Sequence, residues 1–189
     1  MGSERVNLPP GFIFSPTDEE LVLHFLYPKS FLLPFHPNII PDLDLSLFHP
    51  SQLNGKALLS GNQYYFFTKY KKKRGTESGY WKKEIGVTES VVSADAGKKV
   101  GIKKYLVFNN GEAPHGTETS WLMQEYHLCT CGFNTRGTQK PDKTKWVLCR
   151  VYEKKRDSED DEGGSTELSC MDQLYMSTLG DEEEEVSFP

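Results

Sequence analysis

The side chains best suited to bind another molecule lie in one stretch, TKYKKKRGTESGYWKKEIG at residues 68–86. Lysine and arginine at this density bind phosphates, and such flanking contacts can fix a β-ribbon in the major groove of DNA. The aromatic pair Tyr80 and Trp81 would anchor that ribbon. A solvated loop, or a nuclear-import signal at KKKR, is the alternative, and residue chemistry alone favours neither. The basic side chains of the stretch are Lys69, Lys71, Lys72, Lys73, Arg74, Lys82 and Lys83.

The charge of the chain is divided unevenly along its length. The 189 residues carry 22 basic and 27 acidic side chains, a net of −5, but residues 157–189 hold 12 of the acids and none of the bases. Residues 1–156 therefore carry 22 bases and 15 acids, and residues 69–104 alone carry 11 bases and 4 acids. A focused basic region beside an acidic segment indicates a nucleic-acid partner, because phosphates attract clustered cations.

Signatures of catalysis are absent from the sequence. It has no Walker loop, no dinucleotide fingerprint, no His-Glu-x-x-His and no Gly-x-Ser-x-Gly, so we expect neither an enzyme nor a cofactor. A zinc set of His127, Cys129, Cys131 and Cys149 is conceivable, but Cys-x-Cys is not the usual spacing and Cys149 lies in an apolar strand pattern. We therefore expect no metal, and reduced thiols. No stretch approaches the ~20 apolar residues of a membrane span, so we expect no membrane partner.

The elements that must position the basic side chains are a helix followed by strands. Thr17 and Glu20 bound a capping box, which predicts a helix that ends near Tyr27 because Pro28 cannot continue it. Residues 34–56 are rich in proline and indicate loop with one short helical piece. Aromatic and β-branched runs follow, namely QYYFFT, GYWKK, KKVGIKKYLVF, TSWLMQEYHL and TKWVLCRVYE. A helix and then five or six strands without helical crossovers predict an antiparallel α+β fold.

Composition divides the chain into three expected parts. Residues 1–6 form a flexible N-terminus, residues 7–156 a folded domain, and residues 157–189 a disordered acidic tail. The tail is rich in Asp, Glu, Ser and Gly and cannot bury a core. Within it, ELSCMDQLYMSTL forms an apolar island.

Four segments occur in a characteristic order: LPPGFIFSPTDEELVLHFL, GYWK, VGIKKYLVFNNGEAPHGTETSWLMQEYHL and WVLCRVYEKK. Over residues 7–156 the chain resembles the NAC domain of plant transcription factors. The short acidic tail ending EVSFP resembles that of the short xylem NAC-domain proteins. The resemblance implies a twisted antiparallel sheet packed between helices, dimers, a nuclear location, and double-stranded DNA sites with a CGT-type core. It also implies that one strand edge, here WKKEIG at residues 81–86, enters the major groove.

Several positions depart from the family's pattern. WKKEIG is one residue longer than the family's WKATG and carries Lys83 and Glu84 in place of small residues. His115 and Glu118 stand where the family often has lysines, and His127 where it has an arginine. Glu84 and the changes at positions 115, 118 and 127 remove or oppose positive charge, so the resemblance predicts weaker and more salt-sensitive DNA binding than in a typical member.

Other basic side chains match basic positions of the family. Lys71 and Arg74 align with two family arginines, although lysine lacks the bidentate fork of arginine. A second basic segment is expected to contact phosphates or support nuclear import, with solubility of a sheet face as the alternative. Its residues are Lys98, Lys99, Lys103 and Lys104.

The segment LPPGFIF is expected, by resemblance, to form a dimer interface. In the family an arginine at the position of Ile13 pairs across the interface with a glutamate at the position of Glu20, and this chain keeps only Glu20. We therefore predict a weaker or more hydrophobic homodimer and a bias toward heterodimers with other NAC chains. The interface residues are Leu8, Pro9, Gly11, Phe12, Ile13 and Glu20.

Two short motifs resemble docking peptides. Residues 43–47, LDLSL, match the Leu-x-Leu-x-Leu pattern of plant repressors that bind corepressors, but we expect Leu45 and Leu47 to pack inside the domain. Leu168, Cys170 and Asp172 resemble the Leu-x-Cys-x-Glu motif that docks on retinoblastoma-related proteins, with Asp one methylene short of Glu. An acidic-hydrophobic activation tail is an equal alternative.

Two functional hypotheses follow. The first is a nuclear, sequence-specific DNA-binding transcription regulator that acts as a homodimer or heterodimer. It would repress developmental programmes such as xylem differentiation and secondary wall formation. The second is an interaction adaptor that pairs with other NAC chains or with a retinoblastoma-related protein and binds DNA weakly itself.

Overall fold

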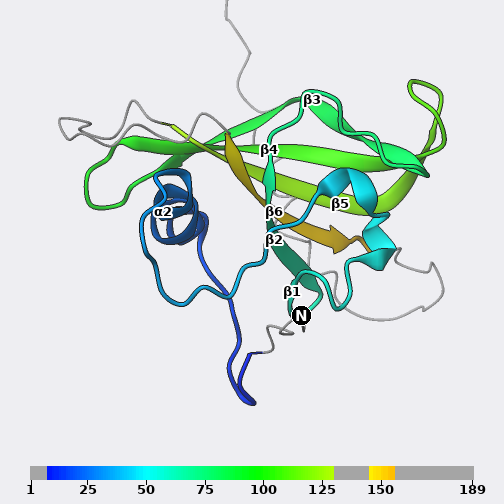
Figure 1. Ribbon diagram of the computed structural model, residues 1–189. Helices are drawn as coiled ribbons and strands as arrows, with labels where there is room; N and C mark the ends of the chain where they lie inside the picture. The colour runs from blue at the N-terminus through cyan, green and yellow to red at the C-terminus, as the bar shows by residue number, and fades with distance from the viewer. Residues whose placement is uncertain (1–7, 130–144, 156–189) are drawn as a thin grey trace, which may run out of the picture. The chain divides into compact units, whose positions relative to one another are not determined.

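A computed structural model describes residues 8–129 and 145–155. Within these residues six strands form one sheet in the order β1-β2-β6-β5-β4-β3, and every neighbouring pair runs antiparallel. Figure 1 shows β3 and β4 crossing the molecule as long neighbouring strands. The strands are β1 Leu58–Ser60, β2 Gln63–Lys69, β3 Gly79–Val92, β4 Lys99–Asn110, β5 Thr117–Leu128 and β6 Trp146–Glu153.

A continuous helical segment precedes the sheet. It consists of α1 Asp18–Glu20, the π-helical turn η1 Leu21–Leu26, and α2 Tyr27–Ser30. The capping box is confirmed, because Glu20 N–H donates to Thr17 Oγ1 at 3.2 Å and Thr17 N–H donates to Glu20 Oε2 at 2.8 Å. The expected end before Pro28 is wrong. Pro28 is accommodated where the hydrogen-bond pattern changes from the π-helical turn η1 to α2, and the segment continues to Ser30.

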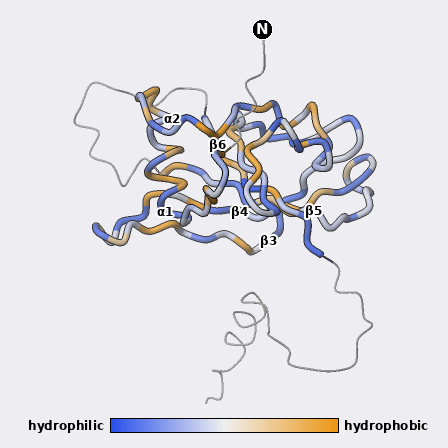
Figure 2. The backbone as a smooth tube through the Cα atoms, turned by 90° about the horizontal axis from the view of Figure 1, so that it is seen from below, coloured by the Kyte–Doolittle hydropathy of each residue, from blue (hydrophilic) through white to orange (hydrophobic). Residues whose placement is uncertain are grey.

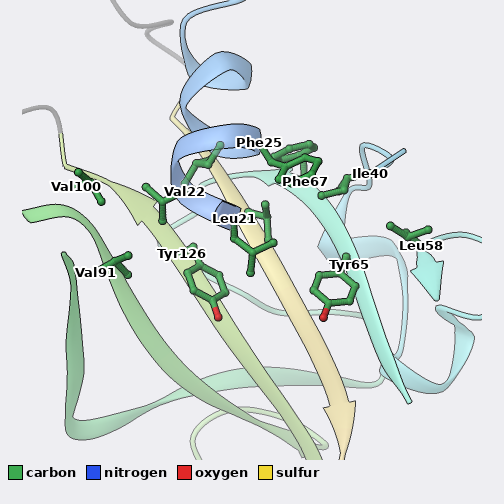
Figure 3. Close-up of a cluster of buried hydrophobic side chains, with 12 residues drawn as sticks. Leu21, Val22, Phe25, Ile40, Leu58, Tyr65, Phe67, Val91, Val100 and Tyr126 are labelled. Atoms are coloured by element: carbon green, nitrogen blue, oxygen red, sulfur yellow. The ribbon is translucent and has the colours of Figure 1, made fainter. Parts of the chain in front are cut away.

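One hydrophobic core lies between this helical segment and the sheet. Figure 3 shows Leu21 and Val22 of η1 directed toward Tyr126 of β5, with Tyr65 of β2 alongside. Close approach requires Gly101 on β4, since a Cβ there would lie 2.9 Å from a methyl of Val22. The buried members of this core are Leu21, Val22, Phe25, Leu26, Ile40, Leu58, Tyr65, Phe67, Val91, Val100, Tyr126 and Leu148.

A second core lies on the other face of the sheet, because successive strand residues point to opposite faces. The 3-10 turns η2 Leu45–Leu47 and η3 Pro50–Gln52 border it. Leu45 packs there, but Leu47 is 66% exposed, so the expectation that both pack is wrong. With about three residues per 3-10 turn, positions 45 and 47 point in different directions. The buried members are Leu45, Leu53, Phe66, Trp81, Leu106, Phe108, Met123, Val147, Cys149 and Val151.

The expected α+β architecture, an antiparallel sheet with helices packed on it, is confirmed. All five predicted strand runs are strands, and Figure 2 shows hydrophobic and hydrophilic residues intermixed along the chain. The short strand β1 was not predicted, and β3 continues past GYWKK to Val92. The helices of the described residues include none with the length and apolar character needed to cross a membrane.

Candidate nucleic-acid interface

The basic stretch forms a tethered loop between β2 and β3. Tyr70 N–H donates to the carbonyl of Lys145 at 2.8 Å, and Trp81 N–H donates to the carbonyl of Arg74 at 2.9 Å. These bonds hold the start of the loop against the chain leading into β6 and its end against β3. The side chains of Lys71, Lys72 and Lys73 between them are exposed. The loop therefore presents its lysines from a fixed backbone.

Arg74 is turned inward, unlike the lysines before it. Its Nε and a terminal nitrogen donate to the two oxygens of Glu125 on β5, at 2.8 and 2.6 Å. The Glu125 side chain is only 1% exposed. Burial alone would raise the pKa of Glu125, but hydrogen bonds from His127 and Arg74 lower it below its usual value. Arg74 thus neutralises a buried carboxylate and is withdrawn from phosphate contact.

Tyr70 joins the loop to the sheet. Its ring centroid lies 5.1 Å from the guanidinium carbon of Arg74, 5.9 Å from Lys104 Nζ on β4, and 5.6 Å from the ring of His127 on β5. The loop, Lys104 and Glu125 therefore gather on the face of the sheet that carries the second core. Cation–π contacts of this kind stabilise by about 0.5–1 kcal/mol at exposed sites. This role of Tyr70 was not predicted from the sequence, although an aromatic residue inside a basic run is a usable signal.

Lys71 forms an ion pair at the surface. Its Nζ donates to both carboxylate oxygens of Asp44, at 2.8 and 2.9 Å, and to Ser46 Oγ at 3.2 Å. Hydrogen bonds from Lys71 and then Ser46 lower the pKa of Asp44 to about 2. Both side chains of the pair remain largely in solvent, and exposed pairs contribute only about 0–1 kcal/mol. A phosphate could compete with Asp44 for this lysine.

The aromatic pair before the lysines supports β3 from inside. Trp81 is 5% exposed and packs in the second core, with its ring centroid 5.1 Å from that of Phe108. Tyr80 is half-buried, and its ring lies where a Cβ on Gly116 would approach within 2.8 Å. Trp81, which the sequence predicted to contact DNA, packs in the core, and only 5% of it is exposed to a ligand.

Lys103 is also withdrawn from the surface. Its Nζ lies 2.7 Å from an oxygen of Asp18 on α1 and 2.7 Å from an oxygen of Glu89 on β3. Burial opposes the charge of Lys103, yet the hydrogen bonds that it donates to these carboxylates raise its pKa well above the usual value. Asp18 further accepts hydrogen bonds from Tyr126 at 2.7 Å and Arg150 at 3.3 Å. The network ties the helix to the sheet and occupies Lys103.

The remaining predicted cations are lysines on the loop, on β3 and on or just before β4. Lys69 is exposed and lies 5.4 Å from the ring of Trp146, and Lys104 is half-buried beside Tyr70. The other six are exposed and form no ion pair with the described residues: Lys72, Lys73, Lys82, Lys83, Lys98 and Lys99. Lys82 and Lys83 stand on β3, the edge strand of the sheet, while Lys98 and Lys99 lie at the beginning of β4.

The comparisons with known proteins all indicate the same family. The model of the "No apical meristem (NAM) protein" family matches residues 9–128. NAC domain-containing protein 104 of Arabidopsis thaliana is 46% identical over 195 residues, covering 97% of this chain and 100% of that protein. The chain belongs to the NAC family. NAC transcription factor 56 of Arabidopsis thaliana is 40% identical, covering 78% of this chain and 45% of that protein. NAC domain-containing protein 1 of Solanum lycopersicum is 38% identical, covering 100% of this chain and 69% of that protein.

Membership in the NAC family confirms the resemblance found in the sequence. A family that includes transcription factors supports a non-enzymatic, DNA-binding regulator of transcription. Several of its relatives are longer, and this chain spans about half the length of NAC domain-containing proteins 18 and 72 of Arabidopsis thaliana.

The N-terminal arm of this NAC domain carries the expected dimer residues. Phe12 and Ile13 are 71% and 83% exposed, and Figure 1 shows the arm leading away from the helical segment. Pro9 and Gly11 lie in a turn in which Phe12 N–H donates to the carbonyl of Pro9 at 3.1 Å. Leu8 is half-buried and packs against the first core. The arm thus presents apolar side chains to solvent.

An open groove of about 740 Å³ borders this arm. Ile13 and Phe14 line one part of it, and Leu23 and Phe35 line another. Glu20, which also lines the groove, is exposed and accepts the capping bond from Thr17. Apolar and acidic groups therefore face one hollow beside the arm.

Three departures from the family pattern also have defined places. His115 and Glu118 are exposed near the turn between β4 and β5. His127 Nε2 lies 2.5 Å from Glu125 Oε1, so it shares the buried carboxylate with Arg74. The substituted histidine therefore takes part in an internal cluster.

The cysteine expectation is only partly correct. Cys149 is a buried free thiol whose pKa is raised by burial, while Cys129 is disulfide-bonded, which contradicts the reduced state expected for it. Among the described residues no cluster of His, Cys, Asp and Glu could hold a metal ion. Cys131 and the tail motif of Leu168, Cys170 and Asp172 lie outside the described residues.

Proposed function

We propose that this chain is a sequence-specific regulator of transcription that binds double-stranded DNA in the nucleus through β3 and the loop before it. The observation that carries the proposal is a set of exposed lysines, unpaired among the described residues, around β3, an edge strand of the sheet. Lys82 and Lys83 lie on that edge, and Lys72 and Lys73 lie on the tethered loop preceding it. A β-ribbon fits the major groove, and lysines beside it fix its position on phosphates.

The internal ion pairs support DNA binding that is weaker than the number of basic residues in the sequence suggests. Arg74 and Lys103 neutralise carboxylates of the fold, and Lys71 is shared with Asp44. The exposed acid Glu118, near the start of β5, adds a negative charge that opposes an approaching phosphate. Fewer free cations mean fewer phosphate contacts and lower affinity at physiological salt.

Salt titration of binding to a labelled duplex tests this function. Each neutralised phosphate contributes about −0.9 to the slope of log K against log salt, so the six exposed, unpaired lysines on the loop, on β3 and beside the start of β4 would together contribute about −5 for each chain. Lys72→Ala/Lys73→Ala should make the slope shallower by about 2. The matched control Lys154→Ala/Lys155→Ala removes two exposed lysines at the end of β6 and should leave it unchanged. Absence of binding at 50 mM salt would refute the proposal.

The chain is proposed to dimerise through its N-terminal arm, with itself or with another NAC chain. Exposed Phe12 and Ile13 and the neighbouring groove support an apolar contact. Glu20 at the groove is available to an arginine from a different NAC chain, which explains the expected bias toward heterodimers. Ile13→Arg should tighten self-association in sedimentation equilibrium. If the variant dissociates more readily than the natural chain, the interface lies elsewhere.

The direction of regulation is proposed to be repression of developmental programmes such as xylem differentiation and secondary wall formation. The support is the sequence resemblance to short xylem NAC-domain proteins, including the acidic tail. The motif Leu168, Cys170 and Asp172 would bind a retinoblastoma-related protein or corepressor. A residue 160–180 peptide should bind a retinoblastoma-related pocket domain and lose binding on Cys170→Ala. Activation of a reporter by the full chain would contradict repression.

A second candidate function is an adaptor that dimerises with other NAC chains and binds DNA poorly. It is favoured by the engagement of Lys71, Arg74 and Lys103 in ion pairs and by the exposed apolar arm. Selection from a random DNA pool with the full chain separates the two functions. Enrichment of a common sequence supports the regulator. Absence of enrichment, together with binding to another NAC chain, supports the adaptor.

A further inference from the structure

We infer that Glu84 is a specificity-determining residue, which selects a cytosine at the base pair facing the bulge in β3. The inference rests on the proposed DNA-binding function and adds a base preference to it. It requires that Glu84 be displaced from the strand ladder, be free to accept a hydrogen bond, and be brought close to DNA by neighbouring cations.

The pairing of β3 with β4 breaks at Glu84. Lys83 pairs with Leu106, and the next paired residue, Thr88, faces Lys104. Five steps along β3 thus oppose two along β4, so residues 84–87 leave the ladder as a bulge. Gly86 has φ of +87°, and a Cβ at that position would meet no atom within 4 Å. Bulges at sheet edges re-aim side chains, and this one lies on the side of β3 where the described strands provide no partner.

The carboxylate of Glu84 is exposed and makes no hydrogen bond or ion pair with the described residues. Lys82 and Lys83 precede it directly and are also exposed. Phosphates attract these lysines and repel the carboxylate. Glu84 is therefore best accommodated away from the DNA backbone, where a base offers a hydrogen-bond donor.

The major-groove edges of the bases then decide which base that is. Guanine presents two acceptors, and thymine presents an acceptor and a methyl group, so both reject a carboxylate. Adenine presents its amino donor beside the N7 acceptor, which repels the second carboxylate oxygen. Cytosine presents its N4 amino donor and no acceptor on the same base, and Glu or Asp accepts a hydrogen bond from it. Glu84 should therefore favour cytosine at one position of the site.

The test is selection from a random duplex pool with three full-length chains: the natural chain, Glu84→Gln, and the control Glu77→Gln. Glu77 is an exposed acid in the loop before β3, so Glu77→Gln removes one negative charge, as Glu84→Gln does, but at a position outside the bulge. The natural chain and Glu77→Gln should enrich one cytosine position. Glu84→Gln should accept adenine there, because a glutamine amide can bond both N6 and N7. Competition binding should show the cytosine preference falling about tenfold, the usual scale of one base change.

Two results would overturn the inference. If Glu84→Gln binds every duplex more tightly and selects the same sequence, Glu84 only opposes binding and reads no base. If the natural chain binds DNA with the salt dependence given above but enriches no cytosine, base selection by Glu84 is refuted while DNA binding stands. A chain that fails to bind any duplex overturns the proposed function as well. Thermal melting of the variants checks that the exposed substitution leaves the fold intact.

Discussion

Removal of the Arg74 fork should destabilise the fold more than it weakens DNA binding. In Arg74→Met the stem of the side chain is retained, but Glu125, whose side chain is 1% exposed, loses two hydrogen bonds of 2.8 and 2.6 Å. Breaking a buried ion pair from one side costs about 3–5 kcal/mol. His127 still contacts the carboxylate, so we expect the lower end, about 3 kcal/mol of the free energy of unfolding.

The measurement is urea unfolding at pH 7, followed by tryptophan fluorescence, with Lys73→Ala as the control. Lys73 is exposed on the same loop and forms no ion pair among the described residues, so its loss should change stability by less than about 0.5 kcal/mol. Arg74→Lys distinguishes the roles further, since lysine keeps the charge but loses the fork. We expect Arg74→Lys to be destabilised while its salt slope of DNA binding stays near that of the natural chain.

The pH dependence of stability has a defined sign. The folded-state pKa of Glu125 is lowered by His127 and Arg74 against the opposing effect of burial, so this carboxylate stabilises the fold at pH above about 4.5. That stabilisation is lost as pH falls through the folded-state pKa. Arg74→Met should reduce the stabilisation from the Glu125 carboxylate at pH 7. Stability equal to that of the natural chain at pH 7, within about 0.5 kcal/mol, would refute the structural role of Arg74.

Three further outcomes are expected. Gly101→Ala should destabilise the fold by about 1–3 kcal/mol in thermal melting, because its Cβ would lie 2.9 Å from atoms of η1 and β5. The control Gly75→Ala, whose Cβ would meet no atom within 4 Å, should melt like the natural chain. Asp18→Asn should be less stable than the natural chain at pH 7. Burial raises the folded-state pKa of Asp18, but Lys103, Tyr126 and Arg150 lower it below its usual value, so the difference in stability should shrink as the pH falls below 3.8. Thr17→Ala should cost about 1 kcal/mol in urea unfolding through loss of the cap, and an unchanged midpoint would contradict that role.

Local signals in the sequence predict most of the architecture. The capping box at Thr17 and Glu20 and the alternation of TSWLMQEYHL are readable without a partner, because each depends on a few consecutive residues. Strand β1 has three residues, too few to show a period of two. The continuation of β3 was missed because the bulge after Lys83 interrupts the alternation. Short elements and bulges are therefore the parts of this fold that periodicity cannot show.

The candidate site was predicted less completely, since its side chains pair over long distances in sequence. Arg74 and Glu125 are 51 residues apart, and Lys103 and Asp18 are 85 residues apart. Charge clustering correctly located the exposed lysines but could not show which cations face inward. The alternation Trp81 buried and Lys82 exposed was accessible from the strand pattern. Only the sheet register brings Tyr70, Lys104 and Glu125 to one face.

The cations of this domain fall into three groups that differ in how readily they can bind a phosphate, and burial sets the difference. Arg74 and Lys103 are bound to carboxylates inside the fold, and freeing either would leave a buried charge uncompensated. Lys71 is paired at the surface, where a phosphate can replace Asp44 at a cost of about 1 kcal/mol or less. Lys72, Lys73, Lys82 and Lys83 need no exchange of partners. In the proposed interface, affinity for DNA therefore depends on the unpaired lysines around β3, whereas the buried pair of Arg74 and Glu125 holds the loop that carries Lys72 and Lys73.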